Sequence, residues 1–315
     1  MKKLLFSALA FFILILLIYG CAAMAASAEE YYTIGMAYFE LGKYEEAEKW
    51  LNRARQSDRT MIASQYNLGR LAFERQRYNE AAELFEDILL KDPDNVLALR
   101  AAAYARIKTG DIGIAQIHYI RLLELVPENA DDGYNHALVL YAMERYDEAA
   151  GVLEKYRYSL RDNRDLLLLY ARTQSARNKV EAIDIFSAWL AEGSDPKVRY
   201  EYALALEHHE LYARAIEELR KAISEVTPST GNIKKSDIRF ALARVLLIAD
   251  GGSTEGIAEM QNAVEEGFND ASAIEKLIES GRISGANRDR LRNIASGIRR
   301  AHENVLETDS EGGSQ

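Results

Sequence analysis

YYTIGMAYFELGKYEEAEKWLNRA, from Tyr31 to Ala54, is the stretch that decides the fold. It contains two amphipathic halves joined by a short turn at 41–43, a pattern typical of two antiparallel helices. Small residues, Gly35 and Ala47, stand where the two helices must cross, because a large side chain there would hold them apart. One hairpin of this kind cannot bury its own apolar stripe, so we expect copies of it to stack.

The small residues recur along the chain with a period of 34. The first crossing position is occupied by Gly35, Gly69, Ala103, Ala137 and Ala171, and the second by Ala47, Ala81, Ala115 and Ala149. Two later copies have the pairs Ala203 with Ala215 and Ala243 with Gly256. The four prolines fall at the junctions between copies, where a missing N–H does least harm: Pro93, Pro127, Pro196 and Pro228.

This period and pattern resemble the tetratricopeptide repeat (TPR) family. The second copy carries the motif most completely, as Tyr66-Asn67-Leu68-Gly69, Tyr78-Asn79-Glu80-Ala81, Phe85 and Pro93, whereas the tryptophan of the family motif is missing from every copy. The resemblance covers about residues 28–268. It implies an all-α fold, a right-handed superhelical solenoid of about seven helix hairpins.

The repeat pattern divides the chain into four predicted segments. These are a signal or anchor at 1–28, one continuous solenoid at 29–268, C-terminal capping helices at 269–307 and a disordered polar tail at 308–315. The capping interpretation of the last helix rests on its polarity, since a solenoid needs a solvated end. Its five arginines are alternatively a contact for anionic lipid or a partner: Arg288, Arg290, Arg292, Arg299 and Arg300.

The N-terminus has the layout of an export signal, with Lys2 and Lys3 before the uncharged apolar run Leu4–Tyr19. Three interpretations remain open. Ile18-Tyr19-Gly20-Cys21 resembles a bacterial lipobox, which would make Cys21 the site of lipidation. Alternatively, cleavage follows Ala26-Ser27-Ala28, or the stretch from Leu4 to Ala28, which is long enough to span a bilayer, stays as an uncleaved anchor. All three predict an exported protein of the bacterial cell envelope, and the first predicts a lipid-anchored, periplasm-facing one.

Composition limits the classes of partner and chemistry. The chain of 315 residues has a net charge of −10, which disfavours nucleic acid, and one cysteine, which excludes an intrachain disulfide. None of the five histidines has the spacing of a metal site, and no nucleophile elbow or phosphate-binding loop is present. We expect the acid pairs Asp131-Asp132 and Glu265-Glu266 to be solvated. The sequence therefore predicts no enzyme, no cofactor and no metal.

In the TPR family the first helices line a concave groove. Carrying these positions over copy by copy gives the candidate peptide-binding residues Tyr32, Met36, Phe39, Tyr66, Asn67, Arg70, Phe73, Arg100, Tyr104, Tyr134, Asn135, Tyr141, Arg172, Tyr200 and Arg244. Tyrosine and arginine often anchor interfaces. We expect Asn67 and Asn135 to bond a peptide backbone and the pair Arg70 and Arg100 to hold a carboxylate. Packing between neighbouring helices is the competing role for each of these side chains.

The predicted function is that of an interaction scaffold. A protein or peptide segment would bind in the groove and be held in an envelope assembly. The alternative is a periplasmic TPR lipoprotein of a solute-transport system that docks a ligand-binding protein.

Overall fold

The computed structural model describes residues 27–159, 162–227 and 233–312, with side chains as far as residue 302. Every regular element in these ranges is a helix, as the repeat pattern predicts. The chain divides into two compact units, unit 1 at residues 1–143 and unit 2 at residues 144–315. The period alone gave no sign of this boundary, which falls at the turn inside the fourth predicted copy.

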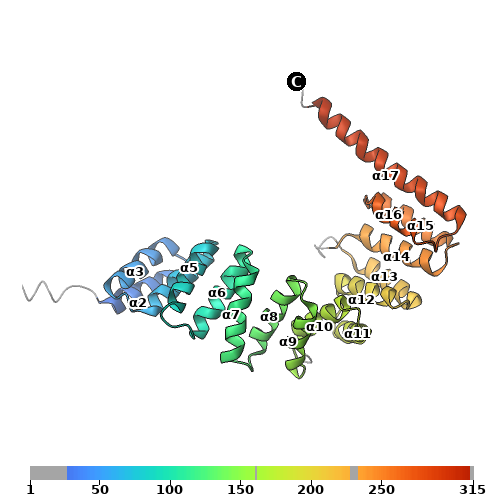
Figure 1. The fold of residues 1–315 in the computed structure, drawn as a ribbon. Coiled ribbons are helices and arrows are strands. Elements are labelled where there is room, and N and C mark those ends of the chain that lie inside the picture. The colour runs from blue at the N-terminus through green and yellow to red at the C-terminus, as the bar shows by residue number, and fades with distance from the viewer. Residues whose placement is uncertain (1–26, 160–161, 228–232, 313–315) are drawn as a thin grey trace, which may run out of the picture. The chain divides into compact units, whose positions relative to one another are not determined.

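Unit 1 contains three helix hairpins and one further helix (Figure 1). The helices are α2 (Ala28–Glu40), α3 (Tyr44–Ser57), α4 (Ile62–Glu74), α5 (Tyr78–Leu89), α6 (Val96–Thr109), α7 (Ile112–Leu125) and α8 (Ala130–Ala142). Each helix packs on the next in chain order, so the hairpins are stacked.

Unit 2 continues the same pattern. Its helices are α9 (Tyr146–Lys155), α10 (Arg164–Ala176), α11 (Glu181–Ala191), α12 (Pro196–His208), α13 (Tyr212–Glu225), α14 (Lys235–Ala249), α15 (Thr254–Glu265), α16 (Ala271–Glu279) and α17 (Gly285–Gly312). Pro196 is at the first position of α12, which needs no N–H donor, whereas Pro228 lies outside the described residues.

The crossing positions hold small residues, as the sequence predicts, because the partner helix lies in contact with them and leaves no room for a larger side chain. A Cβ on Gly69 would lie 2.6 Å from the ring of Phe85, and one on Gly35 would lie 2.9 Å from Leu51. The alanines at the crossings of both units are completely buried: Ala47, Ala81, Ala103, Ala115, Ala137, Ala149, Ala171, Ala203, Ala215 and Ala243.

Helix starts repeat with the same period. Ser27, Asn95, Asn129 and Asn163 each precede a first helix, and each side chain accepts a backbone N–H of the first turn. The turns after α2, α4, α6, α8, α10 and α12 repeat as well, since each contains one residue with φ between +57° and +86°, whereas the turn between α14 and α15 contains none. These left-handed residues are Gly42, Gln76, Gly110, Glu144, Asn178 and Glu210. Only two of them are glycine, so composition did not reveal the conformation.

The C-terminal end of unit 2 has its own core, in which Phe240 stacks on Phe268 at 4.2 Å between ring centroids. Helix α17 adds Leu291, Ala295 and Ile298 to this core and exposes the five arginines named above. It is helical to Gly312, so most of the tail predicted from residue 308 continues the helix instead.

Among the described residues, no helix is both long and apolar enough to cross a bilayer. The export signal, the uncleaved anchor and the lipidation site Cys21 are predictions for residues that the structure does not describe.

Candidate peptide-binding face

Aromatic and basic side chains from α2, α4 and α6 meet on the first-helix side of unit 1. Phe73 stacks on Tyr104 at 5.1 Å between ring centroids, and the guanidinium of Arg70 lies 5.0 Å from the centroid of Phe39. The ammonium of Lys108 lies 5.3 Å from the centroid of Tyr104. We call Phe39, Arg70, Phe73, Tyr104 and Lys108 the unit 1 face.

The unit 1 face contains a small hollow. Its volume is about 190 Å³, and its lining residues are Arg70, Phe73, Glu74, Phe85, Ala101 and Tyr104. The wall is aromatic, while the rim carries one charge of each sign. Tyr104 is 47% exposed, which leaves a large apolar surface in contact with water.

Asn67 positions Arg70 rather than facing a ligand. Its amide nitrogen donates to the hydroxyl of Tyr32 at 3.0 Å and to the carbonyl of Ala63 at 2.9 Å, and its oxygen accepts from Arg70 at 3.0 Å. Asn67 is buried. The expected bond from this amide to a peptide backbone is therefore corrected, because its donors and acceptor are already satisfied within the repeat.

Arg100 is also committed to the fold. Its guanidinium donates two hydrogen bonds of 2.7 Å to the carboxylate of Asp132, which is completely buried. The hydrogen bond that Arg100 donates to Asp132 raises the pKa of Arg100. Burial, and then the charge of Asp132, raise the pKa of the neighbouring Tyr119 to about 12. The expected Arg70–Arg100 clamp is thus corrected, as is the expectation that Asp132 is solvated.

Most of the other side chains predicted to bind a peptide in unit 1 are half-buried and lie on α2, α4 and α8. Tyr32, Met36, Phe39 and Phe73 pack beside core clusters, and the ring of Tyr66 lies 5.4 Å from that of Phe85. Tyr134, Asn135 and Tyr141 lie on α8. The structure therefore brings together the aromatic residues of the first three copies, partly as packing and partly as exposed surface.

In unit 2 the predicted arginines are neutralised by acids of α12. Arg172 donates to both carboxylate oxygens of Glu201, at 2.7 and 3.1 Å, and Arg244 to both oxygens of Glu207, at 2.8 and 2.6 Å. Tyr200, also on α12, is half-buried, and burial raises its pKa. The acid Glu266, expected to be solvated, binds Arg239 at 2.9 Å.

Two larger hollows lie in unit 2. The first, of about 490 Å³, is lined by Leu204, Glu207, His208, Glu210, Tyr212, Arg244, Ile248, Ser280 and Arg282. Arg282 closes one side of it by donating to the hydroxyl of Tyr212 at 2.6 Å and to Glu210 at 3.3 Å. The charges around this hollow are thus paired with one another.

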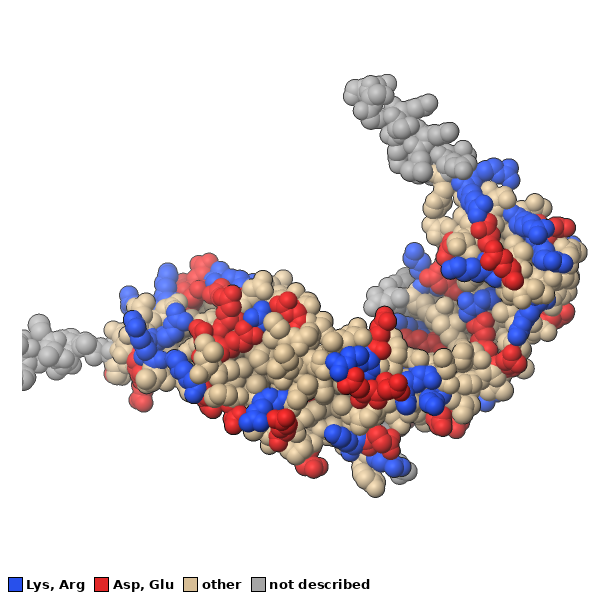
Figure 2. Space-filling view, in the orientation of Figure 1, with Lys and Arg blue, Asp and Glu red and all other residues tan. Residues whose placement is uncertain are grey.

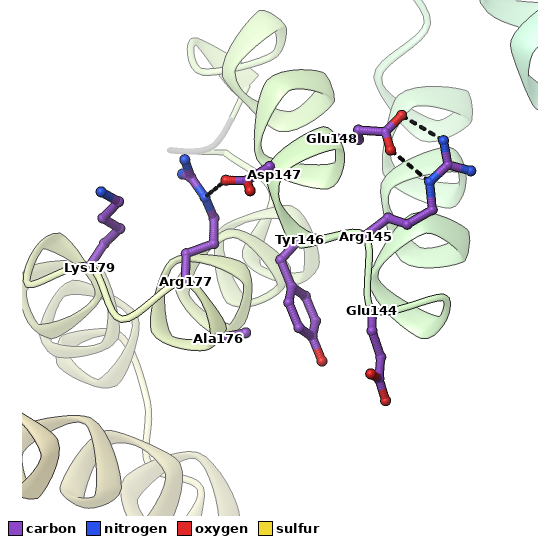
Figure 3. Close-up of a pocket in the computed structure, with 8 residues that line it drawn as sticks. All are labelled: Glu144, Arg145, Tyr146, Asp147, Glu148, Ala176, Arg177 and Lys179. Atoms are coloured by element: carbon purple, nitrogen blue, oxygen red, sulfur yellow. Dashed lines mark hydrogen bonds and ion pairs between the residues drawn. The ribbon is translucent and has the colours of Figure 1, made fainter.

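The second hollow, of about 430 Å³, lies beside the turn before α9 (Figure 3). Figure 3 shows Arg145 and Glu148 facing each other, joined by two bonds of 2.7 Å, and Arg177 joined to Asp147 at 2.7 Å. Glu144 and Lys179 complete the charged part of the lining. Three acids and three bases therefore line this hollow, and it has no net charge to attract an ion.

No group of three histidine, cysteine or acidic residues is arranged to hold a metal ion within the described ranges. The surface features described above are exposed aromatic rings and charges that are mostly paired.

Comparison with known proteins places the repeats in a family. Residues 28–60 and 66–130 match models described as "Tetratricopeptide repeat". The chain is 25% identical over 164 residues to an "Uncharacterized lipoprotein" of Treponema pallidum. This match covers 52% of this chain and 84% of that protein. It is 29% identical over 118 residues to the mouse "N-alpha-acetyltransferase 16, NatA auxiliary subunit", and this match covers 37% of this chain and 14% of that protein.

A solved structure shows the same fold. The crystal structure of a tetratricopeptide repeat protein from Parabacteroides merdae has a TM-score of 0.56 at 19% identity, covering 80% of this chain and 97% of that one. The crossing residues, the capped first helices and the repeating turns described above are the physical basis of these matches. Residues 28–60 and 66–130 of the chain are thus tetratricopeptide repeats.

Proposed function

We propose that this protein is a non-enzymatic scaffold that holds an extended peptide segment of a partner against the unit 1 face. The observation that carries the proposal is the exposed stack of Phe73 on Tyr104 beside Arg70. Aromatic and arginine side chains supply large contact area with a polar end, and such residues dominate the binding energy of interfaces.

Arg70 is available to a partner. Among the described residues its polar contact is the side-chain oxygen of Asn67, and no carboxylate neutralises it. A guanidinium held beside aromatic rings is weakly hydrated and forms charge-assisted bonds with a peptide carbonyl or carboxylate. The hollow between Phe73 and Tyr104 would take one apolar side chain of the same peptide.

The test is crosslinked capture of a partner from membrane extract, with the Arg70→Ala/Tyr104→Ala variant as bait beside the wild type. The control variant, Arg172→Ala/Leu204→Ala, changes the same repeat position in two consecutive copies of unit 2. We expect the first variant to lose the partner and the control to keep it, with unchanged helicity in both. Equal capture by all three baits would contradict the proposal.

We propose further that the scaffold is exported and tethered to the cell envelope through a lipid on Cys21. The apolar run before Cys21 and the similarity to an "Uncharacterized lipoprotein" support this location. Fatty-acid labelling that disappears in Cys21→Ala would support the tether. Labelling that persists would rule out the lipid on Cys21, and a wild type that takes up no label would favour cleavage after Ala28 or an uncleaved anchor.

The solute-transport alternative is the second candidate, supported by the hollow of about 490 Å³ in unit 2. Polar side chains converge on it, although they pair with one another. A ligand-binding protein captured by the wild type and by Arg70→Ala/Tyr104→Ala, but lost with Arg244→Ala, would favour this candidate over the first.

A further inference from the structure

Three isoleucines form a stripe on the solvent side of α7. Ile114 is 40% exposed, Ile117 64% and Ile120 44%. They are three residues apart along the helix and therefore share one face. Gly113, on the same face, has open space within 4 Å of where a Cβ would stand. Nothing among the described residues of unit 1 covers this stripe.

The other second helices of the repeat show what the fold requires here. At the positions of Ile114, Ile117 and Ile120, α3 has Glu46, Lys49 and Asn52, and α5 has Glu80, Glu83 and Glu86. In unit 2, α9 has Glu148, Gly151 and Glu154. A hairpin of this design folds with polar residues on the solvent side, so packing within the repeat does not explain three isoleucines. In Figure 2 the surface of unit 1 over α6 and α7 is mostly tan, whereas α2 to α5 carry many charges.

An acidic edge runs beside the stripe. The neighbouring helix α5 is joined to α7 by the contact of Glu86 with His118, 3.4 Å between Oε1 and Nε2. On the solvent side of α5, Glu83 and Asp87 are exposed and form no ion pair among the described residues. Leu90, at the end of the same helix, is 82% exposed. The surface thus combines an apolar strip with uncompensated negative charge on one side.

We propose that the solvent face of α7, together with the edge of α5, docks an amphipathic helix of a partner protein. Leucine-like side chains of that helix would cover Ile114, Ile117 and Ile120, and lysines or arginines along its flank would face Glu83 and Asp87. An amphipathic helix that lays its apolar face on an apolar strip is a recurrent mode of recognition. The site lies on the second helices, so it is separate from the unit 1 face.

Charge argues against a second copy of this chain as the occupant. A two-fold axis that pairs α7 with α7 in antiparallel fashion places α5 beside α5, so that Glu83 and Asp87 meet their own copies. Like charges facing across an interface oppose association. The net charge of −10 adds to this repulsion. A basic helix removes the repulsion and the exposed apolar area together.

The probe for the test is a labelled 18-residue synthetic helix with leucines at i, i+3, i+4 and i+7 spacing and lysines on one flank. Its twin has glutamates in place of the lysines. Fluorescence anisotropy measures binding of each to residues 27–315, which contain all the helices described above. The key variant is Ile114→Glu/Ile117→Lys/Ile120→Asn, which gives α7 the solvent face of α3. Ile117→Lys alone serves if the triple variant does not fold.

We expect the lysine peptide to bind the wild type and to lose about tenfold or more in affinity with the triple variant. Glu83→Lys/Asp87→Lys should weaken binding several-fold, and 500 mM salt should remove that second difference. Equal binding of the glutamate twin, equal binding to the triple variant, or no binding at 1 mM peptide would each overturn the proposal. So would a dimer seen by sedimentation that the triple variant abolishes, since it would identify a second copy as the occupant.

Discussion

Arg70 in unit 1 and Arg172 in unit 2 occupy the same position of the repeat but have different surroundings. Arg172 is held by both oxygens of Glu201, and Arg244, again at the same position, by both oxygens of Glu207. Arg70 has instead an amide oxygen and the ring of Phe39. The repeat therefore fixes where an arginine stands, and the neighbouring first helix decides whether it is part of the fold or open to a ligand.

The same contrast extends to the aromatic residues. Phe73 and Tyr104 stack on the exposed side of unit 1, whereas the aromatic pair Phe186 and Tyr202 of unit 2, at other repeat positions, is buried in the core. We therefore place the proposed binding face on unit 1, whereas Arg172 and Arg244 of unit 2 are already paired with carboxylates.

The largest effect should come from placing a charge at a helix crossing. Ala81→Glu buries a carboxylate without a partner and should lower the stability of unit 1 by more than about 4 kcal/mol. Hydrogen exchange should show lost protection in α4 to α6 and retained protection in α12 to α14, because a repeat array transmits stability mainly between neighbours. Ala215→Glu should give the reverse pattern. Loss of protection in both units with either variant would show that they unfold as one.

The next largest effect is a difference in unfolding free energy between Arg100, which is paired with a buried carboxylate, and Arg70, which is not. Arg100→Ala leaves the buried carboxylate of Asp132 without its partner and should cost about 3 kcal/mol of unfolding free energy. Arg70→Ala, at an exposed position, should cost less than about 0.5 kcal/mol. Urea unfolding followed by circular dichroism measures both. Similar costs for the two variants would mean that Arg70 also belongs to the structure.

The 34-residue period predicted the helices and their crossings because the crossings demand small residues at fixed positions. It also placed the aromatic rings on the first-helix side. It did not predict which arginines are neutralised, because the acids have no common spacing. Asp132 is 32 residues after Arg100, Glu201 is 29 after Arg172, and Glu207 is 37 before Arg244. The isoleucine stripe, in contrast, was accessible from the sequence by comparing equivalent positions of α3, α5 and α7.

Low pH should reduce the stability of both units, in each through protonation of one carboxylate. In unit 1, the hydrogen bond from Arg106 holds the pKa of Glu86 below its ordinary value of 4.5. In unit 2, burial acts to raise the pKa of Glu225, but the hydrogen bonds from Arg199 and Ser194 and the charges of Arg199 and Lys221 together outweigh it, and the pKa is lowered. A lowered pKa stabilises the folded state above pH 4.5, and this contribution disappears as the pH falls through the folded-state pKa.

Glu86→Gln and Glu225→Gln should therefore each cost about 1 kcal/mol at pH 7. The difference from the wild type should shrink as the pH falls below 4.5. Denaturant titrations at pH 7, 5 and 3 measure the effect. A difference that is constant over this range would show that the charge of the carboxylate makes no contribution.

The smallest effects are expected at the turns, where glycine is the left-handed residue in two turns of unit 1 and in none of the turns after α8, α10 and α12. Gly110, with φ +86°, can be replaced by Ala only in a left-handed conformation, which should cost about 1 kcal/mol. Asn178 in unit 2, with φ +57°, already tolerates this region, so Asn178→Gly should change stability by only a few tenths of a kcal/mol. Thermal unfolding of the two variants measures both changes in stability. If Gly110→Ala had the melting temperature of the wild type, the turn before α7 would not need the left-handed conformation. That result would contradict the conclusion that the two units share this turn geometry.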